Sequence, residues 1–224
     1  MSDSQKLLKE GLEACRRKDF EEGERLLLEA IEADPNNHEA YNALGKVYRV
    51  LGDFDSAVGY LHKSYTIRPE FTDAMVDLGN LYYDKGMYEE AKREYQRAIE
   101  INQKSFGGHF GLGNVLRKQG KNKEAIDEYD AAIELKKDHY QAYNNLGLCH
   151  MNRENYNDAI YNFKMVMEIK KDLPKAHLNL ARCYERTNRF AEAANEWEHF
   201  IDSGIEGEEL DMAIERLAYC KGKY

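Results

Sequence analysis

The sequence predicts an all-α repeat protein, and three observations lead to this fold class. Small and large residues recur with a period of 34 along most of the 224 residues. Charged residues make up 33% of the chain, mean hydropathy is -0.78, and there are only three prolines, which favours soluble helices over a turn-rich sheet protein. Glycine also returns at one position between the expected helices. A fixed period of this length indicates stacked supersecondary units rather than separate globular domains.

Three residue series keep the period in register. Two consist of small residues: Gly11, Gly45, Gly79, Gly113, Gly147 and Ala181, and Gly23, Ala57, Ala91, Ala125, Ala159 and Ala193. The third consists of large residues: Leu27, Leu61, Tyr95, Tyr129, Phe163 and Trp197. Small residues permit close approach of two helix backbones, and a large residue fills the remaining space. We therefore expect paired helices that bury their apolar faces on the next pair.

The repeat unit resembles the tetratricopeptide repeat (TPR) family. Residues 41–45 (YNALG) and 143–147 (YNNLG) match its opening, and Pro35 and Pro69 match its closing proline. The resemblance covers residues 4 to 207 and implies a right-handed superhelical solenoid of helix-turn-helix repeats. It predicts six repeats, at 4–37, 38–71, 72–105, 106–139, 140–173 and 174–207.

The last segment, 208–224, is predicted to be a capping helix. Leu210, Ala213, Ile214 and Leu217 fall there at helical spacing, and such a helix would cover the exposed end of the stack. Within the repeats, Gly52, Gly86 and Gly120 are expected to end helices in the left-handed conformation, as is Asn188. Lys18 and Glu154 occupy the same repeat position and depart from this pattern.

The resemblance also implies where a ligand binds. In this family the first helix of each repeat lines a concave groove. The groove positions carry eight basic residues (Arg16, Lys46, Arg49, Arg117, Lys118, Lys175, Arg182, Arg186) and four acidic ones (Glu39, Asp73, Asp84, Glu185), whereas the whole chain has a net charge of -9. The predicted peptide contacts are Lys46, Arg49, Asn80, Tyr83, Phe110, Asn114, Arg117, Lys118, Asn145, Met151, Lys175, Arg182 and Arg186.

The function predicted from this groove is that of a protein-protein interaction scaffold. A basic groove favours an acidic peptide segment or a free C-terminal carboxylate. Some family members hold a C-terminal carboxylate with a clamp of five residues, and only Asn114, Asn145 and Lys175 match it here. The simpler interpretation, that exposed helix faces carry charge without a ligand, stays open.

Two other functions are considered. A self-assembling structural protein is suggested by an apolar stripe of Leu8, Leu12 and Cys15, and by Phe200, Tyr219 and Tyr224 near the other end. The stripe could equally fold against the second repeat. A more distant alternative is an accessory segment of a larger enzyme, such as a glycosyltransferase, whose catalytic domain this chain would lack.

No catalytic, cofactor or metal site is expected in this chain. The seven histidines are scattered, the four cysteines form no CxxC pair, and no phosphate-binding GxxxxGK[ST] loop occurs. The acidic charge argues against nucleic-acid binding. No apolar run approaches the roughly 20 residues of a membrane span, and no signal segment opens the sequence, so a cytoplasmic location is expected.

Overall fold

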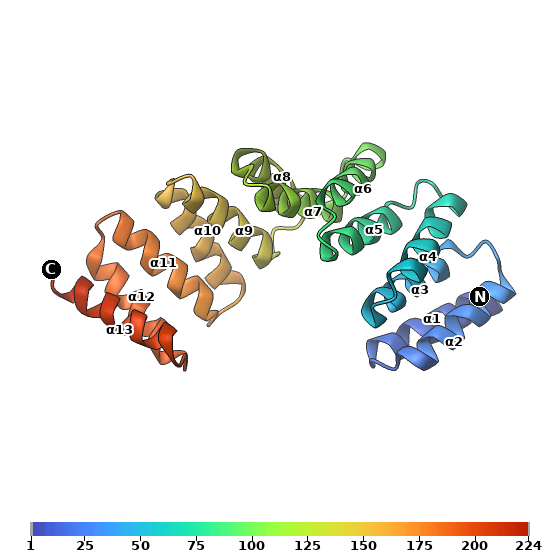
Figure 1. Cartoon of the computed structure of the whole chain (residues 1–224), viewed down its shortest axis with the longest axis horizontal. Helices are drawn as coiled ribbons and strands as arrows, with labels where there is room; N and C mark the ends of the chain where they lie inside the picture. Colours follow the sequence, from blue (N-terminus) through green and yellow to red (C-terminus); the bar gives the residue numbers. More distant parts are fainter. Residues whose placement is uncertain (1, 224) are drawn as a thin grey trace. The chain divides into compact units, whose positions relative to one another are not determined.

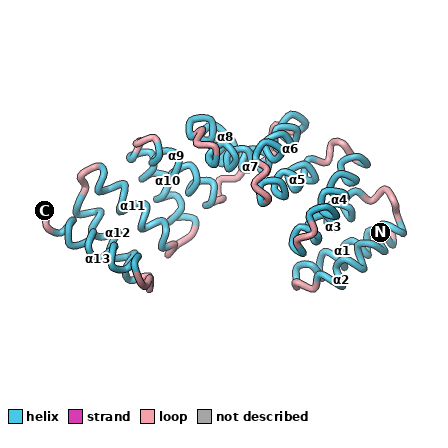
Figure 2. Tube along the Cα trace, in the orientation of Figure 1, coloured by secondary structure: helices cyan, strands magenta, loops and turns pink. Residues whose placement is uncertain are grey.

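The computed structural model describes residues 2–223, and every regular element in that part of the chain is an α-helix (Figure 1). The helices are α1 Asp3–Arg16, α2 Phe20–Ala33, α3 His38–Leu51, α4 Phe54–Ile67, α5 Thr72–Asp84, α6 Tyr88–Ile101, α7 Phe106–Lys118, α8 Asn122–Leu135, α9 Tyr140–Asn152, α10 Tyr156–Ile169, α11 Pro174–Arg186, α12 Phe190–Asp202 and α13 Glu208–Lys221. Short loops join them (Figure 2). The predicted all-α helical repeat architecture is confirmed.

The helix boundaries follow the sequence period. Helices α3, α5, α7, α9 and α11 begin at the residues where repeats two to six are predicted to start. The exact division into six repeats stays a prediction, as does the assignment of 208–224 as a cap. Helix α13 ends at Lys221 and packs on α12, while Tyr224 lies outside the described residues.

The chain forms two compact units, Met1–Val115 and Leu116–Tyr224, and the division between them falls within α7. In the first unit each helix from α1 to α6 packs on its neighbour in sequence order. In the second unit the helices from α8 to α13 do the same. Each unit therefore buries its apolar residues between successive helices.

The paired small and large residues contact each other as predicted. A Cβ atom added to Gly45 would lie only 2.5 Å from Leu61 Cγ. A Cβ atom added to Gly79 would lie 2.6 Å from the Tyr95 ring, and one added to Gly147 would lie 2.8 Å from the Phe163 ring. All six large residues of the series are at most 2% exposed: Leu27, Leu61, Tyr95, Tyr129, Phe163 and Trp197. A side chain at these glycines would push the paired helices apart.

The turns within helix pairs share one backbone conformation. Gly52, Gly86 and Gly120 have φ values of 82°, 75° and 75°, and Asn188 has 57°, as expected for left-handed residues that end a helix. Lys18 (66°) and Glu154 (62°) adopt the same conformation, although neither is a glycine or asparagine. The repeat position therefore determines the backbone conformation. The backbone of Lys18 and Glu154 is held in the left-handed region, which residues other than glycine disfavour.

Candidate functional site

In the first unit, two predicted contact residues form ion pairs within the protein. Lys46 on α3 lies 3.7 Å from Asp77 on α5, measured from Nζ to Oδ2. Arg49, also on α3, lies 2.6 Å from the Asp84 carboxylate at the end of α5. Neighbouring first helices therefore neutralise part of the basic charge that the sequence predicts for a ligand.

Asp77 itself is largely buried. The Asn42 side-chain amide donates a hydrogen bond of 3.0 Å to its carboxylate, while Asn42 Oδ1 is buried without a hydrogen-bond partner. Burial raises the pKa of the Asp77 carboxyl, and the Lys46 charge and the Asn42 hydrogen bond act in the opposite direction. This polar group between α3 and α5 is structural, and it uses charge that would otherwise face a ligand.

The other predicted residues of the first unit also have partners in the chain. The Tyr95 hydroxyl donates to Asn80 Oδ1 at 2.7 Å, and the Tyr83 ring meets the Tyr88 ring edge-on with centroids 5.5 Å apart. Phe110 stacks on Phe106 with centroids 5.7 Å apart. Asn114, on the same helix, also has a partner within the chain.

Three further predicted contacts lie in the second unit: Arg117 and Lys118 at the end of α7, and Asn145 on α9. Burial raises the pKa of the Tyr129 hydroxyl, whereas hydrogen bonds with Arg117 and Asn145 act to lower it. Both residues therefore interact with a side chain of the protein core. Lys118 is exposed, and so is Lys175 at the start of α11. The partial clamp of Asn114, Asn145 and Lys175 stays a prediction.

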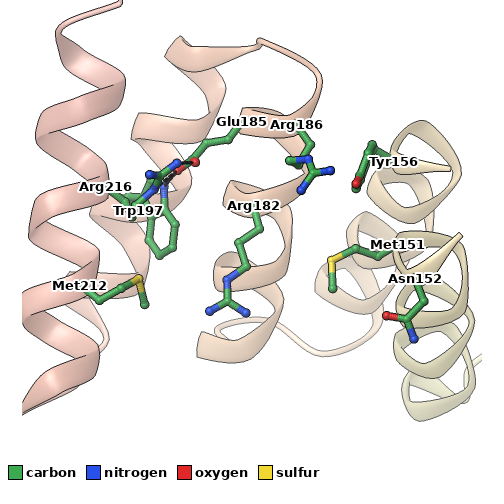
Figure 3. A pocket seen from close by; sticks show the side chains of 9 residues that line it. All are labelled: Met151, Asn152, Tyr156, Arg182, Glu185, Arg186, Trp197, Met212 and Arg216. Carbon is green, nitrogen blue, oxygen red and sulfur yellow. Dashed lines mark hydrogen bonds and ion pairs between the residues drawn. The ribbon is translucent and has the colours of Figure 1, made fainter. Parts of the chain in front are cut away.

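A pocket of about 490 Å³ lies in the second unit among α9 to α13 (Figure 3). It is lined by Met151, Asn152, Tyr156, Arg182, Glu185, Arg186, Trp197, Met212 and Arg216. Its volume is in the range of small ligand sites, which are typically about 300–1,000 Å³. Three of the predicted contacts, Met151, Arg182 and Arg186, line this pocket together.

The three arginines of the pocket differ in their partners. Arg182 is exposed and makes no ion pair with any residue between 2 and 223. Arg186 lies over the Tyr156 ring, 5.0 Å from its centroid, and 3.9 Å from the exposed Glu154 carboxylate. Arg216, from α13, is bound to Glu185. Arg182 therefore offers the free guanidinium of the pocket.

Glu185 is the centre of a hydrogen-bond network. Its side chain is only 8% exposed and accepts bonds from Trp197 Nε1 at 2.6 Å and from Arg216 Nε at 3.2 Å. Arg216 Nη2 also donates to it, and the Cys220 thiol lies 3.5 Å away. Glu185, predicted as an acidic groove position, thus joins α11, α12 and α13 (Figure 3).

Part of the pocket wall is apolar. Met151 comes from α9 and Met212 from α13, and in Figure 3 the Arg182 side chain lies between them. Trp197, only 1% exposed, forms part of the wall beside Met212. Methionine side chains are flexible and polarisable, so such walls adapt to different apolar groups.

Sequence reasoning missed Tyr156, Trp197, Met212 and Arg216 as pocket residues. It drew ligand contacts only from first helices, whereas Tyr156 and Trp197 come from second helices. A usable signal existed for α13, because Arg216 follows Arg182 by one period of 34. Extending the period beyond residue 207 would have placed Arg216 at the groove position that Arg182 occupies.

The apolar stripe of the first helix packs inward. Leu8 is 6% exposed and lies in a cluster with Leu27, Leu44 and Val47, with Leu12 and Cys15 packed against it. Of the two interpretations of this stripe, folding against the second repeat is the one that the structure supports. Phe200 is also buried, at 2% exposure, whereas Tyr219 is exposed.

Two of the cysteines are part of the apolar core, and one histidine forms a polar pair. Cys149 and Cys183 are fully buried, and burial raises the pKa of their thiols to about 11 and about 12. His177 Nδ1 lies 2.7 Å from Glu196 Oε2. Within residues 2–223, no three His, Cys, Asp or Glu side chains are grouped as metal ligands. In the same range, no helix is long and apolar enough to cross a bilayer.

Family models match most of the repeat region. Models described as TPR repeat and Tetratricopeptide repeat match residues 26–59, 79–120, 113–153 and 151–197. No curated protein matches the sequence. The matched segments include α9 to α11, which supply six of the nine residues of the pocket.

Solved structures share the fold at low sequence identity. PilF of Pseudomonas aeruginosa matches with a TM-score of 0.85 and 16% identity over 95% of this chain and 97% of that one. PilW, described as a widely conserved type IV pilus biogenesis factor, matches with a TM-score of 0.81 and 18% identity over 94% and 98%. YrrB, described as a TPR protein with an unusual peptide-binding site, matches with a TM-score of 0.70 and 22% identity over 85% and 98%.

Proposed function

Because this chain belongs to the tetratricopeptide repeat family, we propose that it is a non-catalytic interaction scaffold that binds a carboxylate-bearing peptide segment of a partner protein. The binding site in this proposal is the pocket among α9 to α13. The carboxylate belongs either to an acidic side chain or to a free C-terminus. The chain acts in the cytoplasm and binds neither nucleic acid nor a cofactor.

A single observation carries the proposal. Arg182, predicted from the repeat as a ligand contact, has no acidic partner among residues 2–223 and lines a pocket that also contains two methionines and the predicted contact Arg186. A planar guanidinium binds a carboxylate through two parallel hydrogen bonds, which gives both charge and orientation. The methionines would add affinity by burying an apolar side chain of the same ligand.

The likeness to YrrB supports a peptide as the ligand, since that protein is described by its peptide-binding site. The other predicted contacts extend the proposal to a longer groove: Lys46, Arg49, Asn80, Tyr83, Phe110, Asn114, Arg117, Lys118, Asn145 and Lys175. Most of them already have partners within the chain, so we expect them to contribute less than Arg182.

The test is selection of short random peptides on the intact chain, from one library with free C-termini and one with blocked C-termini. Peptides from either library should carry a carboxylate near an apolar residue. Their affinity, measured by isothermal titration calorimetry, should fall at least about tenfold with Arg182→Gln, or about 1.4 kcal/mol.

Arg153→Gln is the matched control. Arg153 is an exposed arginine that follows the pocket residue Asn152 in sequence but does not itself line the pocket. Affinity should be unchanged in this variant. Selected peptides that bind Arg182→Gln as tightly as the unmodified protein would exclude the pocket as the site.

A further inference from the structure

Two arginines at equivalent places in the pocket differ in whether their charge is available. Arg182 is the ninth residue of α11, and Arg216 is the ninth residue of α13. Arg216 donates to Glu185 through Nε and Nη2, whereas Arg182 has no acidic partner among residues 2–223. Of these two guanidinium groups, that of Arg216 is neutralised and that of Arg182 is not paired with any described carboxylate.

Glu185 is well placed to keep Arg216 neutralised. Its side chain is 8% exposed, and the Trp197 indole and the Cys220 thiol also contact its carboxylate. These contacts come from α12 and α13, so the carboxylate is fixed from two sides. It is also the only carboxylate among the nine residues that line the pocket.

Arg186 does not replace Arg216 as a second anion contact. Its guanidinium is stacked over Tyr156 at 5.0 Å and lies near Glu154 at 3.9 Å. Both members of that ion pair are well exposed, so the pair is weak, but the aromatic contact directs Arg186 toward α10. Figure 3 shows Arg186 beside Tyr156 and Arg182 between the two methionines.

We propose that Glu185 is the residue that determines specificity in this pocket, because by neutralising Arg216 it restricts the ligand to a single carboxylate beside an apolar side chain. This inference rests on the proposed function and names its ligand class. The carboxylate binds Arg182, and the neighbouring apolar side chain packs on one of the two methionines that flank this arginine, Met151 or Met212. A second carboxylate would meet the paired Glu185 and Arg216, so it would lose hydration without gaining a free cation.

The test uses four acetylated peptides that end in leucine. One ends in Ser-Gly-Leu with a free C-terminus and has one carboxylate, one is its C-terminal amide, and one ends in Ser-Asp-Leu with a free C-terminus and has two. A fourth peptide, Ser-Glu-Leu amide, has one side-chain carboxylate and distinguishes that source from a C-terminus. Affinities are measured by calorimetry on the full chain at fixed ionic strength.

The unmodified protein should bind both single-carboxylate peptides at least about fivefold more tightly than the peptide with two. Glu185→Gln keeps the shape of the side chain and removes its charge, so Arg216 becomes available. The peptide with two carboxylates should then bind at least about tenfold more tightly than it does to the unmodified protein. Glu185→Gln combined with Arg216→Gln should abolish that gain.

Arg216→Gln alone provides a second measurement if Glu185→Gln weakens the docking of α13, which the fluorescence of Trp197 would report. In this variant the Glu185 carboxylate has no counter-charge. The ratio of affinities between the single-carboxylate peptides and the peptide with two carboxylates should therefore increase. The inference is overturned if Glu185→Gln loses affinity for all peptides equally. It is also overturned if the ratio of affinities between the single-carboxylate and two-carboxylate peptides decreases in Arg216→Gln. Binding that ignores Arg182→Gln, or no binding at all, overturns the proposed function as well.

Discussion

The two units place a basic residue at the same point of a helix and surround it differently. Lys46 is the ninth residue of α3, and the sixth residue of the next first helix, Asp77 on α5, forms an ion pair with it. Arg182 is the ninth residue of α11, but the sixth residue of α13 is the buried Ala213. The availability of a basic residue therefore depends on the helix that follows it.

A second pair of positions shows the same dependence with the charges reversed. Arg49, twelfth in α3, pairs with Asp84, thirteenth in α5. In the second unit the twelfth residue of α11 is Glu185, and the thirteenth of α13 is Cys220, which contacts it. The same geometry thus forms an ion pair in the first unit and a thiol contact in the second, where Arg216 supplies the charge.

The largest expected effect tests whether the two units unfold separately. Leu61 in α4 is fully buried against Gly45, so Leu61→Ala should destabilise the first unit by about 2–5 kcal/mol. The protein has a single tryptophan, Trp197, and it lies in the second unit. In urea, the circular dichroism signal at 222 nm should fall well before Trp197 fluorescence changes.

Phe163→Ala is the matched variant in the second unit, since Phe163 is equally buried against Gly147. Here the fluorescence transition should move to lower urea. If Leu61→Ala shifts both signals to the same midpoint, the two units unfold as one and the comparison between them loses its energetic basis.

An intermediate effect is expected from Asp77→Asn. The asparagine amide can donate to the unpartnered Asn42 Oδ1 while its carbonyl accepts from Asn42 Nδ2, so one additional buried hydrogen bond forms, contributing about 1 kcal/mol. The ion pair lost with Lys46 is half exposed and contributes little. Urea unfolding at pH 7 should show the gain.

The gain should depend on pH with a defined sign. Folding raises the pKa of Asp77 above its ordinary value of 3.8, so the unmodified protein loses stability as the pH rises through the folded pKa. Asp77→Asn does not lose stability in this way. Its gain in free energy of unfolding over the unmodified protein should therefore be largest at neutral pH and decrease toward pH 4. An advantage that grows on acidification would contradict the assignment.

The smallest effect concerns the left-handed turn residues. Lys18→Gly and Glu154→Gly should each stabilise the chain by less than about 1 kcal/mol, because relief of the left-handed conformation exceeds the entropy cost of glycine. Gly52→Ala should destabilise it by about 1 kcal/mol at the same repeat position. Thermal unfolding of the three variants gives the comparison, and a loss in both glycine variants would show that other contacts hold these turns.

The all-α helical repeat architecture could be predicted from the sequence, whereas the division into two compact units could not. Close approach at Gly45 and Gly147 requires both the missing side chain and the large partner one helix away, and that requirement leaves a local, periodic trace. Helix starts at His38 and Pro174 follow from the same period. The conformation of Lys18 and Glu154 did not follow, because their side chains carry no signal for a left-handed turn.

The candidate site could be predicted only in part. The 34-residue period and the family resemblance that it carries predicted Met151, Arg182 and Arg186 as peptide contacts, and all three line one pocket. Only the tertiary structure decided that Arg49 is neutralised by Asp84, that Arg216 is neutralised by Glu185, and that α13 closes one side of a pocket. The repeat specifies the direction of its own side chains because helix geometry is local. The charge that remains available to a ligand depends on residues about one repeat away in sequence. These residues come into contact only when the helices stack.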